Sequence, residues 1–160
     1  LAENLLTIRL VRSQAIKYGI DANKIGVFGD SAGCHTAAYL STRYDEKIYE
    51  PIDDADSVSA RPDFQVLCAP GLNMTNIKGE DVDVLSHVTE KTPKAFIVAA
   101  VDDTTVAVGA NALAYYQKLW SQVVDSEIHI FQTGGHALLE DSTSRVWLDL
   151  SVNWLNEYVK

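Results

Sequence analysis

Cysteine and basic residues are scarce in this 160-residue sequence. Two cysteines, Cys34 and Cys68, are too few for a disulfide framework, and they do not indicate a redox compartment. The 13 basic residues stand against 22 acidic ones, and the resulting net charge of -9 argues against partners such as nucleic acids and anionic membranes. The sequence also lacks an apolar run long enough to cross a bilayer, so no membrane span is predicted.

Hydrophobic residues make up 47% of the chain, which is enough to bury a core. We therefore expect a single domain over residues 1–160. Four strand-length apolar runs alternate with helical patterns, which predicts βαβ units, a parallel sheet and flanking helices. The runs are Ile25–Phe28, Phe64–Ala69, Ala95–Ala100 and Glu127–Phe131. The two central runs are predominantly apolar, as in strands covered on both faces.

Helical spacing of apolar residues predicts a first helix over Leu1–Tyr18, which Gly19 would end. Further helical patterns are expected after the first strand, from Val108 to Trp120 and from Trp147 to Tyr158. The crossover Leu72–Thr92 has only a weak helical face, with turn signals at Asn73, Asn76 and Gly79. An acidic stretch with Asp53, Asp54 and Asp56 is interpreted as a solvated loop rather than a metal site.

The segment Ile25–Gly33 joins the first strand to the next helix through the motif Gly29-Asp30-Ser31-Ala32-Gly33. A Gly-x-Ser-x-Gly motif between a strand and a helix is typical of a sharp elbow that presents a nucleophilic serine. Such a turn strains the serine backbone, and we expect Gly29 and Gly33 to provide the necessary space. The Ala32 N–H, at the positive end of the helix, is then a candidate oxyanion donor. The alternative is a chance occurrence of the motif.

A serine hydroxyl needs an imidazole base, which in turn needs a carboxylate to orient it. Asp102 and Asp103 directly follow the Ala95–Ala100 run, and His136 follows the Glu127–Phe131 run after two glycines. Because parallel strands end at one edge, the order serine, acid, histidine predicts that these side chains meet. His129 is interpreted as a structural or surface residue and His35 as a helix-packing residue, whereas His87 lies in the poorly defined crossover. The sequence has no His-x-His or His-Glu-x-x-His spacing, so no metal or cofactor is predicted.

The run Tyr18–Gly33 resembles the nucleophile region of α/β-hydrolase esterases. Ser59-Ala60-Arg61-Pro62-Asp63-Phe64 is similar to the pattern of the bacterial acetyl-xylan and feruloyl esterase group, a set of carbohydrate esterases. Cys34 departs from this pattern, because those relatives usually carry a second glycine there. The resemblance implies an α/β-hydrolase sheet of about four parallel strands, without the N-terminal strands of the complete fold.

The resemblance also favours Asp103 over Asp102 as the catalytic acid. Asp103-Thr104-Thr105-Val106-Ala107-Val108 is similar to the acid turn of the family, with Ala107 in place of a proline. Asp102 is then interpreted as a turn-capping carboxylate. The implied catalytic set is Ser31, Asp103 and His136, with Ala32 contributing to the oxyanion hole.

A second oxyanion donor usually comes from a His-Gly-Gly-Gly-type loop before the elbow, where this sequence has one helix. We therefore expect the chain to be the C-terminal part of a hydrolase domain, with the Ile25 strand as an exposed edge. A truncated protein, a cleaved protein and a natural minimal form are the competing explanations. Along that edge, the partner would be a complementing N-terminal segment or, in a homodimer, a second copy.

The leading functional hypothesis is a serine carboxylic-ester hydrolase that forms an acyl-serine intermediate. The resemblance implies short, acetyl-like acyl groups on carbohydrates or small alcohols. One alternative is a serine peptidase of the prolyl-oligopeptidase type, which shares the order serine, aspartate, histidine. Another is a non-catalytic hydrolase fragment, since the loss of one oxyanion donor commonly costs about a hundred- to thousand-fold in rate.

Overall fold

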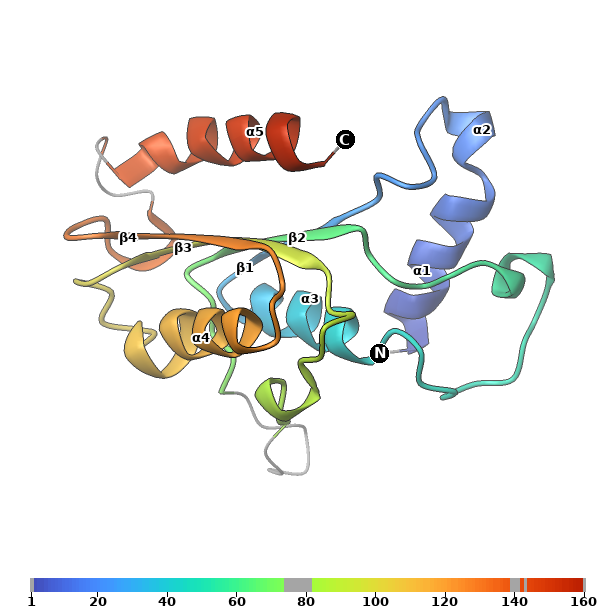
Figure 1. The fold of residues 1–160 in the computed structure, drawn as a ribbon, viewed down its shortest axis with the longest axis horizontal. Coiled ribbons are helices and arrows are strands. Elements are labelled where there is room, and N and C mark those ends of the chain that lie inside the picture. Colours follow the sequence, from blue (N-terminus) through green and yellow to red (C-terminus); the bar gives the residue numbers. More distant parts are fainter. Residues whose placement is uncertain (1, 74–81, 139–141, 143, 160) are drawn as a thin grey trace.

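The computed structural model describes residues 2–73, 82–138, 142 and 144–159 (Figure 1). Within them, four parallel strands form one sheet in the order β1-β2-β3-β4. The strands are β1 (Val27–Asp30), β2 (Phe64–Cys68), β3 (Lys94–Ala100) and β4 (Ser126–Phe131). The predicted α/β class is confirmed, with small shifts in the strand bounds. The largest shift is at β1, which starts and ends two residues later than the predicted Ile25–Phe28 run.

The register of the sheet brings the carboxyl ends of all four strands to one edge. Asp30 pairs with Cys68, Cys68 with Val98, and Val98 with His129. The segments that follow β1, β3 and β4 therefore begin side by side. These are the segments that carry Ser31, the Asp102–Asp103 pair and His136.

Helices cover both faces of the sheet, with α3 and α4 on one face and α5 on the other (Figure 1). Their bounds are α3 (Ala32–Arg43), α4 (Ala114–Ser121) and α5 (Trp147–Tyr158). A π-helical segment, Gly109–Leu113, precedes α4 where an α-helix was predicted from Val108. The predicted first helix is divided at Gln14 into α1 (Ala2–Ser13) and α2 (Ala15–Tyr18), and Gly19 ends it with a φ of 66°.

The connections contain short helical turns. Four 3-10 helices lie at Asp54–Ser57, Leu85–His87, His136–Leu138 and Ser144–Val146. The acidic loop is organised by its own carboxylates, because Asp53 caps the first of these helices and Asp56 accepts a hydrogen bond from Tyr49. In the crossover, the turn signals Asn76 and Gly79 lie outside the described residues. Each helix in the described part of the chain is too short or too polar to traverse a lipid bilayer.

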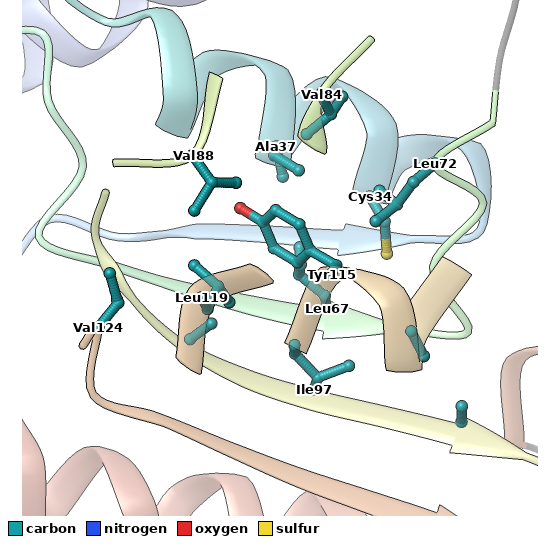
Figure 2. Packing of buried hydrophobic residues seen from close by; sticks show 14 residues of the cluster. Cys34, Ala37, Leu67, Leu72, Val84, Val88, Ile97, Tyr115, Leu119 and Val124 are labelled. Carbon is teal, nitrogen blue, oxygen red and sulfur yellow. The ribbon is translucent and has the colours of Figure 1, made fainter. Parts of the chain in front are cut away.

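The core between the sheet and the α3–α4 layer is centred on Tyr115, which projects from α4 (Figure 2). Leu67 and Ile97, from β2 and β3, and Cys34, from α3, are fully buried around it. Burial favours these apolar side chains by about 1.5–3 kcal/mol for each large residue. This packing fixes α3, and with it the elbow that α3 begins, against the sheet.

On the opposite face, Trp147 and Trp154 of α5 pack against β2 and β3. The Trp154 ring packs against Phe96, with ring centroids 5.8 Å apart. Trp147 stacks on Phe28 of β1 at 6.4 Å, and Phe28 nevertheless stays 63% exposed. In the described part of the chain, β1 is an edge strand that pairs only with β2.

The exposed edge expected for the first strand is thus observed, and its pairing with a second copy or a complementing segment stays a prediction.

If two copies associate along β1, Phe28→Lys will shift the chain toward the monomer, because the new charge would lie in the apolar contact between the two copies. Light scattering after size-exclusion chromatography measures this shift. Trp120→Lys on α4, where Trp120 is 73% exposed, is the matched control. A wild-type chain that is monomeric at all concentrations contradicts the dimer.

The Tyr115 hydroxyl gives a second prediction, for stability. It donates to Gln65 Oε1 at 3.1 Å, and Gln65 Nε2 donates to the Pro93 carbonyl at 3.0 Å. Burial raises the pKa of Tyr115, so its phenol keeps the donated proton. Tyr115→Phe leaves the buried Gln65 oxygen without this donor and is expected to lower the free energy of unfolding by about 1–2 kcal/mol. Urea unfolding measures the loss, with Tyr116→Phe as control; equal stability of the two variants contradicts the prediction.

Candidate active site

Ser31 occupies the turn between the last residue of β1 and the first residue of α3, with a φ of 51° and a ψ of -120°. A positive φ is unfavourable for a residue with a Cβ, so neighbouring groups must hold it. The Ser31 N–H donates to the Cys68 carbonyl at 3.0 Å. Its carbonyl accepts from the N–H groups of Cys34 and Gly71 at 3.0 and 3.1 Å. The elbow predicted from the Gly-x-Ser-x-Gly motif is therefore present.

The two glycines of the motif have different structural roles. A Cβ on Gly29 would lie 2.6 Å from Cys34 Cα and 2.7 Å from Cys34 N, both backbone atoms that cannot give way. Gly29 is therefore required for α3 to approach β1. A Cβ on Gly33 would meet nothing within 4 Å among the described residues, so the predicted steric role of Gly33 is wrong.

Asn111, a buried residue that sequence analysis missed, stabilises the backbone segment that contacts the elbow. Its Oδ1 accepts from the N–H groups of Leu72 and Asn73 at 2.7 and 3.1 Å. Its Nδ2 donates to the Ala107 carbonyl at 2.9 Å. Asn111 thereby ties the segment after β2, which contacts the Ser31 carbonyl through Gly71, to the turn after β3. A polar residue in the otherwise apolar pattern around Ala112 was the signal in the sequence.

The turn after β3 is organised by Asp103. Its Oδ1 accepts from the N–H groups of Thr105 and Val106 at 2.8 and 2.9 Å, and its side chain is 2% exposed. Its Oδ2 lies 2.8 Å from His136 Nδ1. The Asp103 side chain thus has a fixed direction toward the ring.

His136 follows β4 through the segment Gly134–Leu138, whose backbone is unusual. Gly134, Gly135, Ala137 and Leu138 all have positive φ, at 152°, 62°, 65° and 54°. This path turns the imidazole back across the ends of the strands, and His136 Nε2 lies 2.7 Å from Ser31 Oγ. The histidine favoured by the sequence is thus the one that the structure brings to Ser31.

A single assignment of protons fits these two contacts. An ionised carboxylate only accepts, so His136 Nδ1–H donates to Asp103 and Nε2 accepts from the Ser31 hydroxyl. Burial of the Asp103 carboxyl would raise its pKa, but hydrogen bonds from His136, Val106 and Thr105 outweigh burial and lower the pKa. Asp103 is therefore charged at neutral pH, and the imidazole is held in the form that can take a proton from serine.

The thiols beneath this site are protonated. Burial is the first cause that raises the pKa of Cys68, to about 12, and the Asp30 carboxylate is the second. Burial raises the pKa of Cys34 as well, and its Sγ donates to the Gly29 and Cys68 carbonyls at 3.0 and 3.2 Å. Cys34, the position that departs from the esterase pattern, therefore packs as a small buried side chain and does not compete with Ser31 as a nucleophile.

The other candidate residues lie elsewhere or have other partners. Ala32 is the first residue of α3, so its N–H belongs to the free donors at the start of that helix. Asp102 accepts hydrogen bonds from Gly134 and Gly135, whereas Asp103 caps its own turn. His129 bonds to Glu127, His35 stacks on Tyr39, and His87 contacts Ser86.

One hollow on the described surface does not have Ser31 among its lining residues. It has a volume of about 970 Å³ and lies between α1 and the segment 44–60, where Arg9, Tyr44 and Tyr49 are among its lining residues. Helix α1 lies beyond the amino ends of β3 and β4, away from their carboxyl ends (Figure 1). This hollow therefore lies apart from the hydrogen-bonded side chains of Ser31, His136 and Asp103.

Comparison with known families agrees with this fold. The BD-FAE family model matches residues 5–69, which contain the elbow. The model of the prolyl oligopeptidase family matches residues 69–160, more than half of the chain, which contain Asp103 and His136.

Individual relatives are carbohydrate-active. An endo-1,4-beta-xylanase B from Butyrivibrio fibrisolvens is 27% identical over 148 residues, which are 82% of this chain and 23% of that protein. An acetylxylan esterase from Xylanibacter ruminicola is 26% identical over 152 residues, 80% of this chain and 28% of that protein. An acetyl ester-xyloside bifunctional hydrolase from Caldicellulosiruptor lactoaceticus has a similar crystal structure, with a TM-score of 0.84 and 32% identity over 97% of this chain.

The parallel sheet, the serine elbow and these matches define an α/β-hydrolase fold that is similar to the fold of carbohydrate esterases. Within that class, the chain belongs to the prolyl oligopeptidase family. It spans about a quarter of the length of the two curated relatives and 64% of the similar crystal structure.

The unequal surroundings of Gly29 and Gly33 can be tested directly. Gly29→Ala places a methyl group against the backbone of α3, so we expect loss of the folded elbow and a clearly lower melting temperature. Gly33→Ala adds a methyl group in open space within a helix and is expected to keep or raise stability by up to about 1 kcal/mol. Thermal unfolding of both variants measures the difference. Equal destabilisation by the two substitutions would contradict this account of the turn.

Proposed function

We propose that this chain carries the reactive residues of a serine carboxylic-ester hydrolase. The observation that carries the proposal is the hydrogen-bonded series from Ser31 Oγ through His136 to Asp103, with contacts of 2.7 and 2.8 Å. Separations of this size are within reach of direct proton transfer. The lowered pKa of Asp103 supports the ionised state that an orienting carboxylate needs.

In the proposed reaction, Ser31 Oγ attacks the ester carbonyl while His136 Nε2 takes the hydroxyl proton. The Ala32 N–H donates to the oxyanion of the tetrahedral intermediate, supported by the positive end of α3. Collapse of the intermediate breaks the bond to the alcohol, which leaves with the proton from His136. Water then attacks the acyl-serine by the same steps and releases the acid. Asp103 keeps the imidazole oriented and stabilises its positive charge throughout.

Short acyl groups on carbohydrates or small alcohols are the proposed substrates. The support is similarity to an acetylxylan esterase and to an acetyl ester-xyloside hydrolase, both of which are longer than the part that this chain matches. A peptidase of the prolyl-oligopeptidase type is a second candidate, favoured by the family model that matches residues 69–160. It uses the same serine, histidine and aspartate, so the leaving group distinguishes the two.

A fluorophosphonate probe and two chromogenic substrates test this proposal together. We expect the wild-type chain to be labelled and to hydrolyse p-nitrophenyl acetate faster than a prolyl p-nitroanilide. Ser31→Ala should abolish labelling and lower ester turnover by about 10⁴–10⁶-fold, because it removes the attacking oxygen. Ser121→Ala, at an exposed serine, is the control.

Three results would argue against the ester hydrolase. Faster cleavage of the anilide would favour the peptidase. Labelling that survives Ser31→Ala would place the reactive oxygen elsewhere. A folded wild-type chain without labelling or turnover would favour the non-catalytic alternative.

A further inference from the structure

We infer that Asp102 is a positioning residue: its carboxylate fixes the backbone of the Gly134–Leu138 segment, so that His136 stays between Ser31 and Asp103. This inference deepens the proposed function and rests on it. Asp102 Oδ1 accepts from the Gly135 N–H at 2.9 Å, and Oδ2 accepts from the Gly134 N–H at 3.3 Å. Both oxygens of one side chain thus bind the two residues that immediately precede the histidine.

The segment needs such support because its backbone conformation is intrinsically unfavourable. Four of the five residues from Gly134 to Leu138 have positive φ, and two of them, Ala137 and Leu138, are not glycine. Each such non-glycine residue costs on the order of 1–3 kcal/mol unless its surroundings impose the conformation. Glycine also has the largest conformational freedom to lose, so Gly134 and Gly135 would sample other paths if released.

The end of the segment after His136 is already secured by packing. Leu138 is fully buried among the residues under α5, and Cys68 Sγ donates to the Ala137 carbonyl at 3.4 Å. Before His136, Gly134 packs closely on Ser144, where an added Cβ would lie 2.7 Å from the serine side chain. Asp102 supplies the charged hydrogen bonds on this side, and hydrogen bonds to a charged acceptor are the stronger kind.

Asp102 is itself held in place by the end of the sheet. The neighbouring Val101 N–H donates to the Phe131 carbonyl at 2.8 Å, which ties the turn after β3 to the end of β4. The next residue, Asp103, binds the imidazole from the same turn. Two consecutive carboxylates therefore have complementary roles, since Asp103 orients the ring and Asp102 orients the backbone that carries the ring.

The test compares Asp102→Ala, which removes both acceptors, with Asp102→Asn, which keeps one. Thr104→Ala, at an exposed neighbour in the same turn, is the matched control. A small displacement of a reacting group can cost about 100-fold in rate. We therefore expect Asp102→Ala to lower kcat for p-nitrophenyl acetate by about 10- to 100-fold. KM should change little, Asp102→Asn should lie between Asp102→Ala and wild type, and Thr104→Ala should match wild type.

A second readout is independent of turnover. The proton between His136 Nδ1 and Asp103 should give a downfield NMR signal that disappears in His136→Ala and identifies the ring contact. We expect Asp102→Ala to broaden or abolish this signal and Asp102→Asn to weaken it. If Asp102→Ala does not fold, Asp102→Asn and Thr104→Ala are compared instead, by kcat and by the downfield NMR signal, to test the positioning role.

If the folded Asp102 variants keep the kcat of the wild type and an unchanged downfield NMR signal, the positioning role is overturned. This holds even if the wild-type chain is labelled at Ser31. A wild-type chain without labelling or turnover would instead count against the proposed function. In that case a weakened signal in the Asp102 variants would still support the positioning of His136, and an unchanged signal would overturn it.

Discussion

One imidazole ring must face a hydroxyl with one nitrogen and a carboxylate with the other, and most features of this chain serve that requirement. Ser31 and His136 are separated by 105 positions in the sequence, and they meet because β1 and β4 end at the same edge of a parallel sheet. The core around Tyr115 holds α3, and therefore the elbow, to the sheet. The geometry of this site is thus a result of the packing of the sheet against its helices.

The elements that position the site could be predicted because each depends on local sequence. The alternation of apolar runs and helical patterns indicated a parallel sheet, and the Gly-x-Ser-x-Gly motif between a strand and a helix indicated the elbow at Ser31. The positions of the aspartate pair and His136 after strands indicated that they would share an edge. The choice of Asp103 over Asp102 required resemblance to a family, because both residues follow the same strand.

The features that were missed depend on contacts between distant segments. Asn111 is a polar residue in an apolar helical pattern, but this local signal does not identify its distant partner, the backbone of Leu72. Gly33 looks equivalent to Gly29 in the motif, yet only Gly29 lies against the backbone of α3. Asp102 was interpreted as a turn-capping carboxylate, and the sequence did not indicate that it would bind the N–H groups of the two glycines before His136. Each case is decided by tertiary packing, which brings together segments that are distant in the sequence.

The positive φ of Ser31 also bears on when the chain can react. In an unfolded chain Ser31 is an ordinary alcohol, because neither the left-handed backbone at this residue nor the imidazole is present without the packed sheet. Under the proposed function, a newly made or damaged copy would therefore not react with esters, and the nucleophilic character of Ser31 would develop only once β4 and the segment that carries His136 have packed. A probe that reacts with Ser31 would in that case count only the fully folded copies.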